Sequence, residues 1–244
     1  MSDYHAMIRH AADCYPQESC GLLISTPEGD EYLPARNLAP EPTEAAVIDP
    51  DAWIEAARMG EVIGVVHSHP DGPAVLSGAD RLAQRQTELP WYLVVGEQVR
   101  TFAPVPPLLG RQFAHGTVDC YTLFRDAYAL AGHPLPQFQR SDDWWENGQN
   151  LYLDNLPKYG FTRVDEPQPG DVLLIQLQSD TPNHTAIYLG NSQLLHHLPN
   201  RLSGRDIVGG YWQRHLHSIW RYESWQPSDF MGILNDLAAG SGSM

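Results

Sequence analysis

The chain has 244 residues, with 15 Lys or Arg against 30 Asp or Glu, so its net charge is −15. A chain this acidic is repelled by nucleic-acid phosphates and by anionic membrane surfaces, which argues against both as partners. Its three cysteines are too few and too scattered for a disulfide framework, and no apolar run approaches the roughly 18 residues that cross a bilayer. We expect a cytoplasmic protein without nucleic-acid binding or membrane insertion.

A proline-rich segment divides the chain. The run FAPVPPLLG at 102–110 contains three prolines, which cannot continue a helix or a central strand. The flanking halves are each of a size that folds as a small domain. We predict an exposed linker with the boundary near Leu108, domains at 1–107 and 108–223, and a flexible tail at 224–244.

The first half alternates helices and strands. The apolar run EVIGVVHSH at 61–69 predicts a buried strand, 82–89 a short helix, and WYLVV at 91–95 a second strand. This alternation is typical of an α/β sandwich.

The second half begins with a helix and continues with strands. The segment 119–130 has an amphipathic helical pattern, and the segments 171–177 and 185–189 have strand patterns. Gly190-Asn191-Ser192 predicts a turn into a returning strand at 193–198. This order indicates an α+β domain.

His67, His69 and Asp80 form a candidate metal site in the first half. The two histidines lie two residues apart on the predicted strand, so both imidazoles point to one face. Two nitrogens and one carboxylate oxygen are a catalytic zinc donor set that leaves a position for water. A His-x-His pair alone is more often structural, and Ser77 with Asp80 also fits a helix capping box.

Together with Glu18, these residues complete a longer pattern. Glu18, HSHP at 67–70 and SGAD at 77–80 resemble the JAMM/MPN+ metallopeptidase motif E…H-x-H-x(7)-S-x(2)-D, and PQESCGLL at 16–23 is similar to its first strand. The resemblance implies an α/β JAMM/MPN-like fold that cleaves peptide or isopeptide bonds. It also implies Zn²⁺ ligands and catalytic roles: His67, His69 and Asp80 as ligands, Glu18 as general base and acid, and Ser77 as the group that stabilises the tetrahedral intermediate.

Cys120 is the candidate nucleophile of the second half. It follows Asp119 at the predicted helix start, where the helix dipole favours a thiolate, although a buried apolar role is the alternative. A base is available in His184, which opens an alternating strand. Its partner stays open: a three-residue turn would place His196 on the face of His184, whereas a two-residue turn at 190–191 would pair His197 with His184.

The run HTAIYLGNSQLLHH at 184–197, after the helix that Asp119 and Cys120 begin, resembles the NlpC/P60 cysteine peptidases. The resemblance implies a papain-like α+β fold, Cys120 as nucleophile, His184 as base, His196 as orienting residue, and peptidoglycan stem peptides as substrate. The tyrosine and paired glycines that usually precede the cysteine in that family are missing here.

A JAMM-like domain followed by an NlpC/P60-like domain resembles a family of tail-tip assembly proteins of lambda-like phages over residues 1–223. The resemblance implies other phage tail-tip proteins as partners, and a location in the host cytoplasm during assembly or in the virion tail. It implies a peptidase that acts in tail assembly or cell-wall penetration. The alternatives are a bacterial cytoplasmic peptidase on protein conjugates or muropeptides, and a non-catalytic tail-assembly factor.

Overall fold

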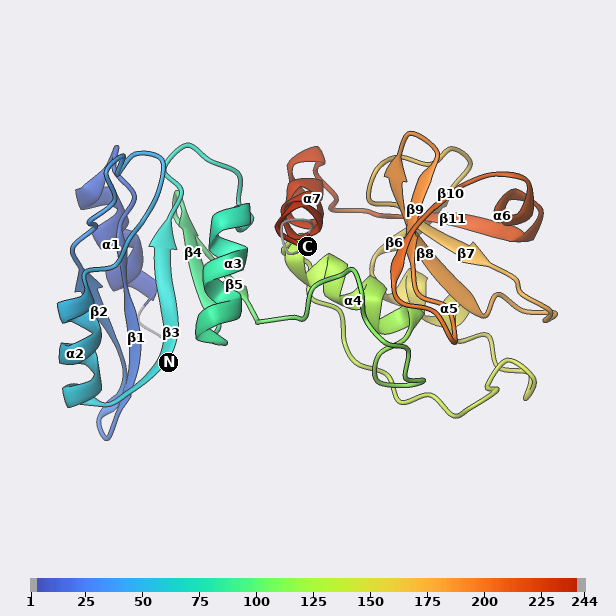
Figure 1. Ribbon diagram of the computed structural model, residues 1–244, viewed down its shortest axis with the longest axis horizontal. Helices are drawn as coiled ribbons and strands as arrows, with labels where there is room; N and C mark the ends of the chain where they lie inside the picture. Colours follow the sequence, from blue (N-terminus) through green and yellow to red (C-terminus); the bar gives the residue numbers. More distant parts are fainter. Residues whose placement is uncertain (1–3, 241–244) are drawn as a thin grey trace. The chain divides into compact units, whose positions relative to one another are not determined.

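The computed structural model describes residues 4–240. The chain divides after Val105 into two compact units, each with its own sheet and hydrophobic core (Figure 1). The division therefore lies slightly before the expected position after residue 107. None of the helices described is long and apolar enough to cross a membrane.

The N-terminal unit is a five-stranded sheet in the order β2-β1-β3-β4-β5, in which the central pair β3 and β4 is parallel. Helix α3 starts earlier than the apolar pattern predicts, because Ser77 caps it one turn upstream. The elements in chain order are α1 (Tyr4–Cys14), β1 (Cys20–Thr26), β2 (Gly29–Ala35), α2 (Pro50–Met59), β3 (Glu61–Ser68), α3 (Gly78–Thr87), β4 (Trp91–Val95) and β5 (Gln98–Phe102).

The sheet of the N-terminal unit has an apolar face on each side, because its side chains alternate along the strands. Val65 belongs to the core that Ala56 of α2 and Ala83 of α3 cover, whereas Val66 packs with Met7 of α1. Successive side chains of a strand point to opposite faces. His67 therefore shares the face of Val65, on the side of α2 and α3.

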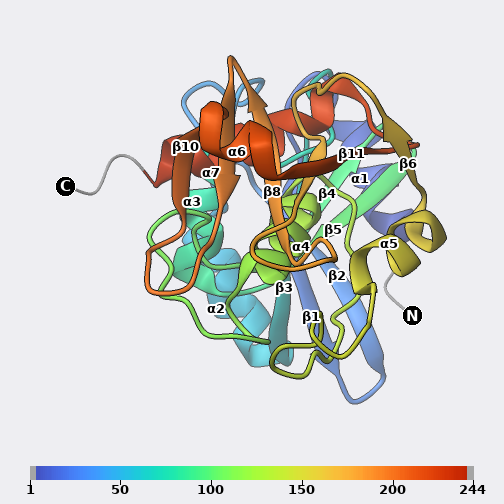
Figure 2. The same cartoon turned by 90° about the vertical axis from the view of Figure 1, so that its right-hand side faces the viewer.

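The C-terminal unit is a six-stranded antiparallel sheet in the order β10-β9-β8-β7-β11-β6. Its strands β10, β8, β11 and β6 are labelled in Figure 2. Helix α4 packs against β8. The elements in chain order are α4 (Cys120–Leu130), α5 (Leu151–Asn155), the 3₁₀ helix η1 (Leu156–Tyr159), β6 (Phe161–Val164), β7 (Val172–Ile175), β8 (His184–Gly190), β9 (Gln193–His196), β10 (Gly204–Ile207), α6 (Gly210–His215), β11 (Leu216–Tyr222), the 3₁₀ helix η2 (Pro227–Asp229) and α7 (Phe230–Ala239).

The β8–β9 hairpin resolves which histidine partners His184. Its loop has two residues, Asn191 and Ser192, with φ of 49° and 56°, as a tight hairpin turn requires. A bulge between Tyr188 and Gly190 then shifts the register, so that Ala186 pairs with His196. A bulge adds one residue to one strand. His196 consequently lies on the face of His184, the pairing expected of the longer turn.

The expected exposed linker is held against the C-terminal unit from Pro106 onward. Leu108 is fully buried. The Arg111 guanidinium donates to the carbonyls of Pro106 and Pro107 and forms a 2.7 Å ion pair with Asp126. The prolines follow the end of β5, a strand that the sequence analysis did not predict, and side-chain hydrogen bonds satisfy the backbone around them.

The segment 224–244 also differs from the expected flexible tail. As far as Gly240 it contains η2 and α7, and α7 packs on α4. Ile233 and Leu237 are buried, and the buried carboxylate of Asp236 accepts the Leu108 N–H at 2.9 Å. The apolar side chains recur at helical spacing, which is why the segment orders itself on the domain. Residues 241–244 lie outside the described part.

We predict that Gly232→Ala destabilises the C-terminal unit. A Cβ at this position in α7 would clash with the backbone carbonyl of Leu130 in α4, and overpacking of this kind costs about 1–3 kcal/mol. Gly210→Ala is the matched control, because a Cβ there meets nothing within 4 Å. Urea unfolding followed by circular dichroism measures the difference. Equal midpoints for both variants would contradict the close packing of α7 on α4.

Candidate active sites

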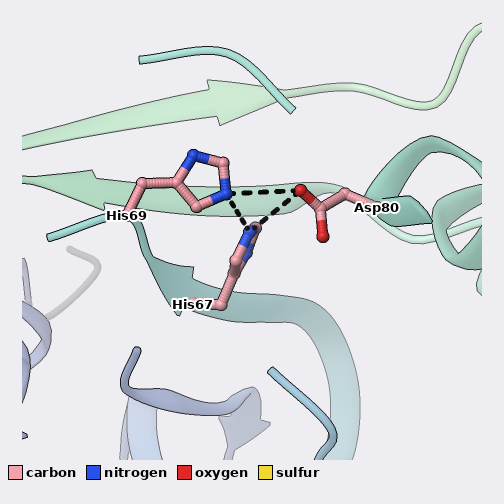
Figure 3. Close-up of side chains that lie close together, drawn as sticks. All are labelled: His67, His69 and Asp80. Carbon is pink, nitrogen blue, oxygen red and sulfur yellow. Dashed lines mark hydrogen bonds and ion pairs between the residues drawn. The ribbon is translucent and has the colours of Figure 1, made fainter. Parts of the chain in front are cut away.

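Three side chains of the N-terminal unit converge on one point (Figure 3). His67 lies near the end of β3, His69 directly follows this strand, and Asp80 lies in the first turn of α3. The His67 Nε2 and His69 Nε2 atoms are 3.2 Å apart, and each lies 3.3 Å from Asp80 Oδ2. Both histidines are buried.

A capping box fixes the Asp80 carboxylate. Ser77 Oγ accepts the Asp80 N–H at 3.1 Å, and Asp80 Oδ2 accepts the Ser77 N–H at 2.8 Å. The same oxygen faces both imidazoles. Burial alone would raise the pKa of Asp80, but His67, His69 and the Ser77 side chain lower it well below its usual range. Asp80 is therefore held as a carboxylate aimed at the histidines.

The outer contacts orient the imidazoles. His69 Nδ1 lies 3.0 Å from the Pro73 carbonyl, so this nitrogen carries the proton and leaves Nε2 free as a donor atom. The His67 ring packs edge-on against Trp91, with centroids 5.3 Å apart. A hydrogen bond thus orients the His69 ring, whereas the buried His67 ring is held by packing and its Nδ1 has no hydrogen-bond partner among residues 4–240.

The spacing of these atoms fits a metal ion. Ligands at the usual zinc distances of about 2.0–2.1 Å in a tetrahedron are separated by about 3.3 Å, and the three observed separations are 3.2, 3.3 and 3.3 Å. The donor set of two imidazoles and one carboxylate is that of a catalytic zinc site. The residues present therefore fit the cation that their pattern predicts.

Glu18 lies beside this centre. Its Oε1 is 4.0 Å from His69 Nε2, and the side chain is buried. The backbone is held on both sides, because the Glu18 N–H donates to Pro42 and the Asn37 amide donates to the Glu18 carbonyl. Burial raises the pKa of Glu18 against the opposing effect of the two histidines. Glu18 thus takes no part in the three-atom cluster but stands within reach of it.

Ser77 is engaged as a helix cap. Its hydroxyl accepts the Asp80 N–H, as the capping-box alternative predicts. The structure therefore places Ser77 next to the centre through Asp80, and its role in catalysis remains a prediction.

The C-terminal unit has a cavity beside the start of α4. Cys120 and His184 both line it, and the tryptophans Trp144 and Trp145 line it as well. Asp119 caps α4, accepting the Thr122 N–H at 3.0 Å, and forms a 2.6 Å ion pair with Arg140. The cap places the thiol at the first residue of the helix, facing the cavity.

The two histidines of the β8–β9 hairpin, His184 and His196, are in contact through their ring nitrogens. His184 Nε2 and His196 Nδ1 lie 3.3 Å apart. Burial, with a smaller effect of neighbouring histidines, lowers the pKa of His184 to about 3. Burial also lowers the pKa of His196 to about 4, against the opposing charge of Asp206. Both rings are neutral at pH 7, so His184 has an unprotonated ring nitrogen there, although its lowered pKa makes it a weak base.

The pKa of the Cys120 thiol is raised, which differs from the thiolate that the sequence predicts. Burial raises the pKa of Cys120, and the adjacent Asp119 carboxylate raises it further, whereas the Tyr152 hydroxyl lowers it. Tyr152 Oη lies 3.4 Å from Cys120 Sγ. The helix dipole is thus outweighed by desolvation and by the capping carboxylate. The sequence gives no signal for Tyr152, because no spacing rule links a short helix to a cysteine 32 residues earlier.

The comparisons with known proteins match both units. The profile of prokaryotic homologs of the JAB domain matches residues 2–105, and the NlpC/P60 family profile matches residues 110–221. The chain is 53% identical over 196 residues to tail tip assembly protein K of Escherichia phage lambda, covering 80% of this chain and 98% of that protein. It is 38% identical to the protein of the same name from Escherichia phage N15, covering 89% and 93%.

The chain belongs to the tail tip assembly protein K family. The predicted pair of domains, JAB/MPN-like and then NlpC/P60-like, is confirmed.

A further relative matches a smaller part of the chain. The "Probable TtuB-protein conjugate cleaving protease" of Thermus thermophilus is 30% identical over 92 residues, covering 36% of this chain and 62% of that protein.

We predict that alkylation of Cys120 by iodoacetamide increases with pH up to and beyond pH 9. The raised pKa of the thiol leaves little thiolate at neutral pH, and the thiolate is the reactive species. Cys20 should remain unlabelled throughout this range, because burial raises its pKa to about 12. Mass spectrometry of tryptic peptides measures both rates. A Cys120 rate that levels off near pH 7 would instead favour the thiolate expected from the helix dipole.

Proposed function

We propose that the chain is a tail-tip assembly protein with two peptidase sites, a zinc site in the N-terminal unit and a cysteine site in the C-terminal unit. The observation that carries the proposal is the set of three donor atoms 3.2–3.3 Å apart, in which outer hydrogen bonds already hold His69 and Asp80. Preorganised, buried donors of this kind are costly to keep without a bound cation.

In the zinc site, His67, His69 and Asp80 would hold the ion. When bound, zinc would polarise the scissile carbonyl and lower the pKa of a water molecule. Glu18, within 4.0 Å of His69 Nε2, would take the proton from the attacking water and deliver it to the leaving amine. Ser77 would stand beside the tetrahedral carbon.

In the cysteine site, His184 would take the proton of the Cys120 thiol as the sulfur attacks the scissile carbonyl. The protonated His184 would then pass this proton to the leaving amine, and water would hydrolyse the thioester. His196 would orient His184 through the 3.3 Å contact between their rings. A neutral imidazole beside a neutral thiol suits this general-base route.

The substrates follow from the resemblances. The NlpC/P60 resemblance favours peptidoglycan stem peptides for the cysteine site, and the cavity of about 550 Å³ is large enough for a short peptide. The relative from Thermus thermophilus, whose name describes cleavage of protein conjugates, favours peptide or isopeptide bonds for the zinc site. The K proteins of phages lambda and N15 favour other tail-tip proteins as partners. The protein would act in the host cytoplasm during assembly or in the virion tail.

We predict about one equivalent of zinc per chain in the purified protein. His67→Ala combined with His69→Ala should abolish binding, because one carboxylate cannot hold the ion alone. Glu18→Gln is the matched control and should retain the metal while it loses peptidase activity. Elemental analysis measures the content. Full zinc retention by the double variant would overturn the ligand assignment.

We predict that the wild-type protein cleaves muropeptides and that Cys120→Ala does not. His69→Ala should leave this cleavage unchanged, since it alters the other site. Because the pKa of His184 is lowered to about 3, its base form persists and the activity should not fall between pH 7 and pH 5 through protonation of this residue. Chromatography of digests measures the products. Equal digestion by Cys120→Ala would assign the activity elsewhere.

A further inference from the structure

A carboxylate stands behind the histidine pair of the C-terminal unit. Asp206 Oδ2 lies 3.9 Å from His196 Nε2, the ring nitrogen that faces away from His184. Nothing in the sequence motif points to Asp206. Cys120 and His184 line the cavity, and His196 and then Asp206 follow behind His184.

The register of β9 and β10 creates this arrangement. His196 pairs with Gly204, and Leu194 pairs with Asp206. Paired residues of neighbouring strands share a face, and diagonal neighbours lie within reach of longer side chains. Gly204 has no side chain, so the space over His196 is open to Asp206, two residues further along β10.

Two donors fix the Asp206 carboxylate. The Trp212 indole N–H donates to Oδ2 at 3.1 Å, and the Ile207 N–H donates to Oδ1 at 2.8 Å. The Trp212 ring also packs edge-on against His196, with centroids 4.7 Å apart, and lies beside His184 at 6.1 Å. One tryptophan thus contacts both rings and holds the carboxylate. This combination would be unexplained if Asp206 were only a solvated surface residue.

We propose that Asp206 is a positioning residue that sets the tautomers of the histidine pair. A carboxylate only accepts hydrogen bonds, so it favours a proton on His196 Nε2. His196 Nδ1 is then an acceptor, and it takes the proton of His184 Nε2. The unprotonated Nδ1 of His184 is left for the thiol of Cys120.

Burial is the main reason that His196 stays neutral, and the charge of Asp206 acts against it. Besides Asp206, the groups that act on its ring are Arg201 and His197, which oppose protonation, and His184 at 3.3 Å. Burial opposes protonation as well. Asp206 therefore selects between two neutral tautomers and does not create an imidazolium.

This inference rests on the proposed cysteine site, but its test does not need the peptide substrate. Histidine-ring ¹⁵N spectra of the full chain at pH 7 distinguish a protonated from an unprotonated nitrogen, with His184→Ala and His196→Ala variants for assignment. We expect protons on Nε2 of both His184 and His196. In Asp206→Asn the amide can donate to His196 Nε2, so the population with His196 Nδ1–H should rise.

Two further variants complete the test. Asp165→Asn, which alters an exposed carboxylate of the same unit, should leave the spectrum unchanged. Trp212→Phe keeps an aromatic ring but removes the indole donor, so it should shift the tautomers in the same direction as Asp206→Asn. Asp206→Asn spectra identical to wild type, or a wild-type His196 with its proton on Nδ1, would overturn the inference. If the tautomers are as expected but the protein does not cleave muropeptides, the role of Asp206 is supported and only the proposed substrate is overturned.

Discussion

A side-chain cap at the start of a helix positions the key group in each unit. Ser77 caps α3, and the reciprocal bond from its own N–H holds Asp80 Oδ2 towards His67 and His69. Asp119 caps α4 and places Cys120 at the first residue of the helix, beside the cavity. Capping satisfies backbone groups that a helix start would otherwise expose. The same bonds that begin the helices therefore aim the side chains on which both candidate sites depend.

The two caps have opposite electrostatic consequences. At α3 the capping carboxylate is itself the candidate ligand, and its neighbours lower the pKa of Asp80, so it is charged whenever a cation could bind. At α4 the carboxylate of Asp119 lies next to the thiol, where burial and its charge raise the pKa of Cys120. The ion pair with Arg140 moderates this charge. The cysteine site consequently rests as a neutral thiol beside a neutral His184, and attack is coupled to proton transfer.

Local patterns in the sequence determined the two domains, the strand with His67 and His69, the helix after Asp119 and the β8–β9 hairpin. Each follows from interactions between residues close in the chain: strand alternation, caps and turn residues. The membership of Asp80 in the metal cluster was implied by the resemblance to the JAMM/MPN+ motif, in which a fixed spacing separates the two histidines from the aspartate. The helical spacing of apolar residues in α7 was also present in the sequence. The glycine- and serine-containing end of the chain nevertheless led to the prediction of a flexible tail.

Only the tertiary structure decided what depends on register, desolvation or distant contacts. The bulge between Tyr188 and Gly190 selects His196 and excludes His197, because one added residue exchanges the faces of a strand. The thiol pKa follows from burial beneath segments far away in the chain, including Tyr152. The approach of Asp206 to His196 depends on the pairing of β9 with β10. The sequence determined which chemical groups are available; packing decided which of them meet and in what protonation state.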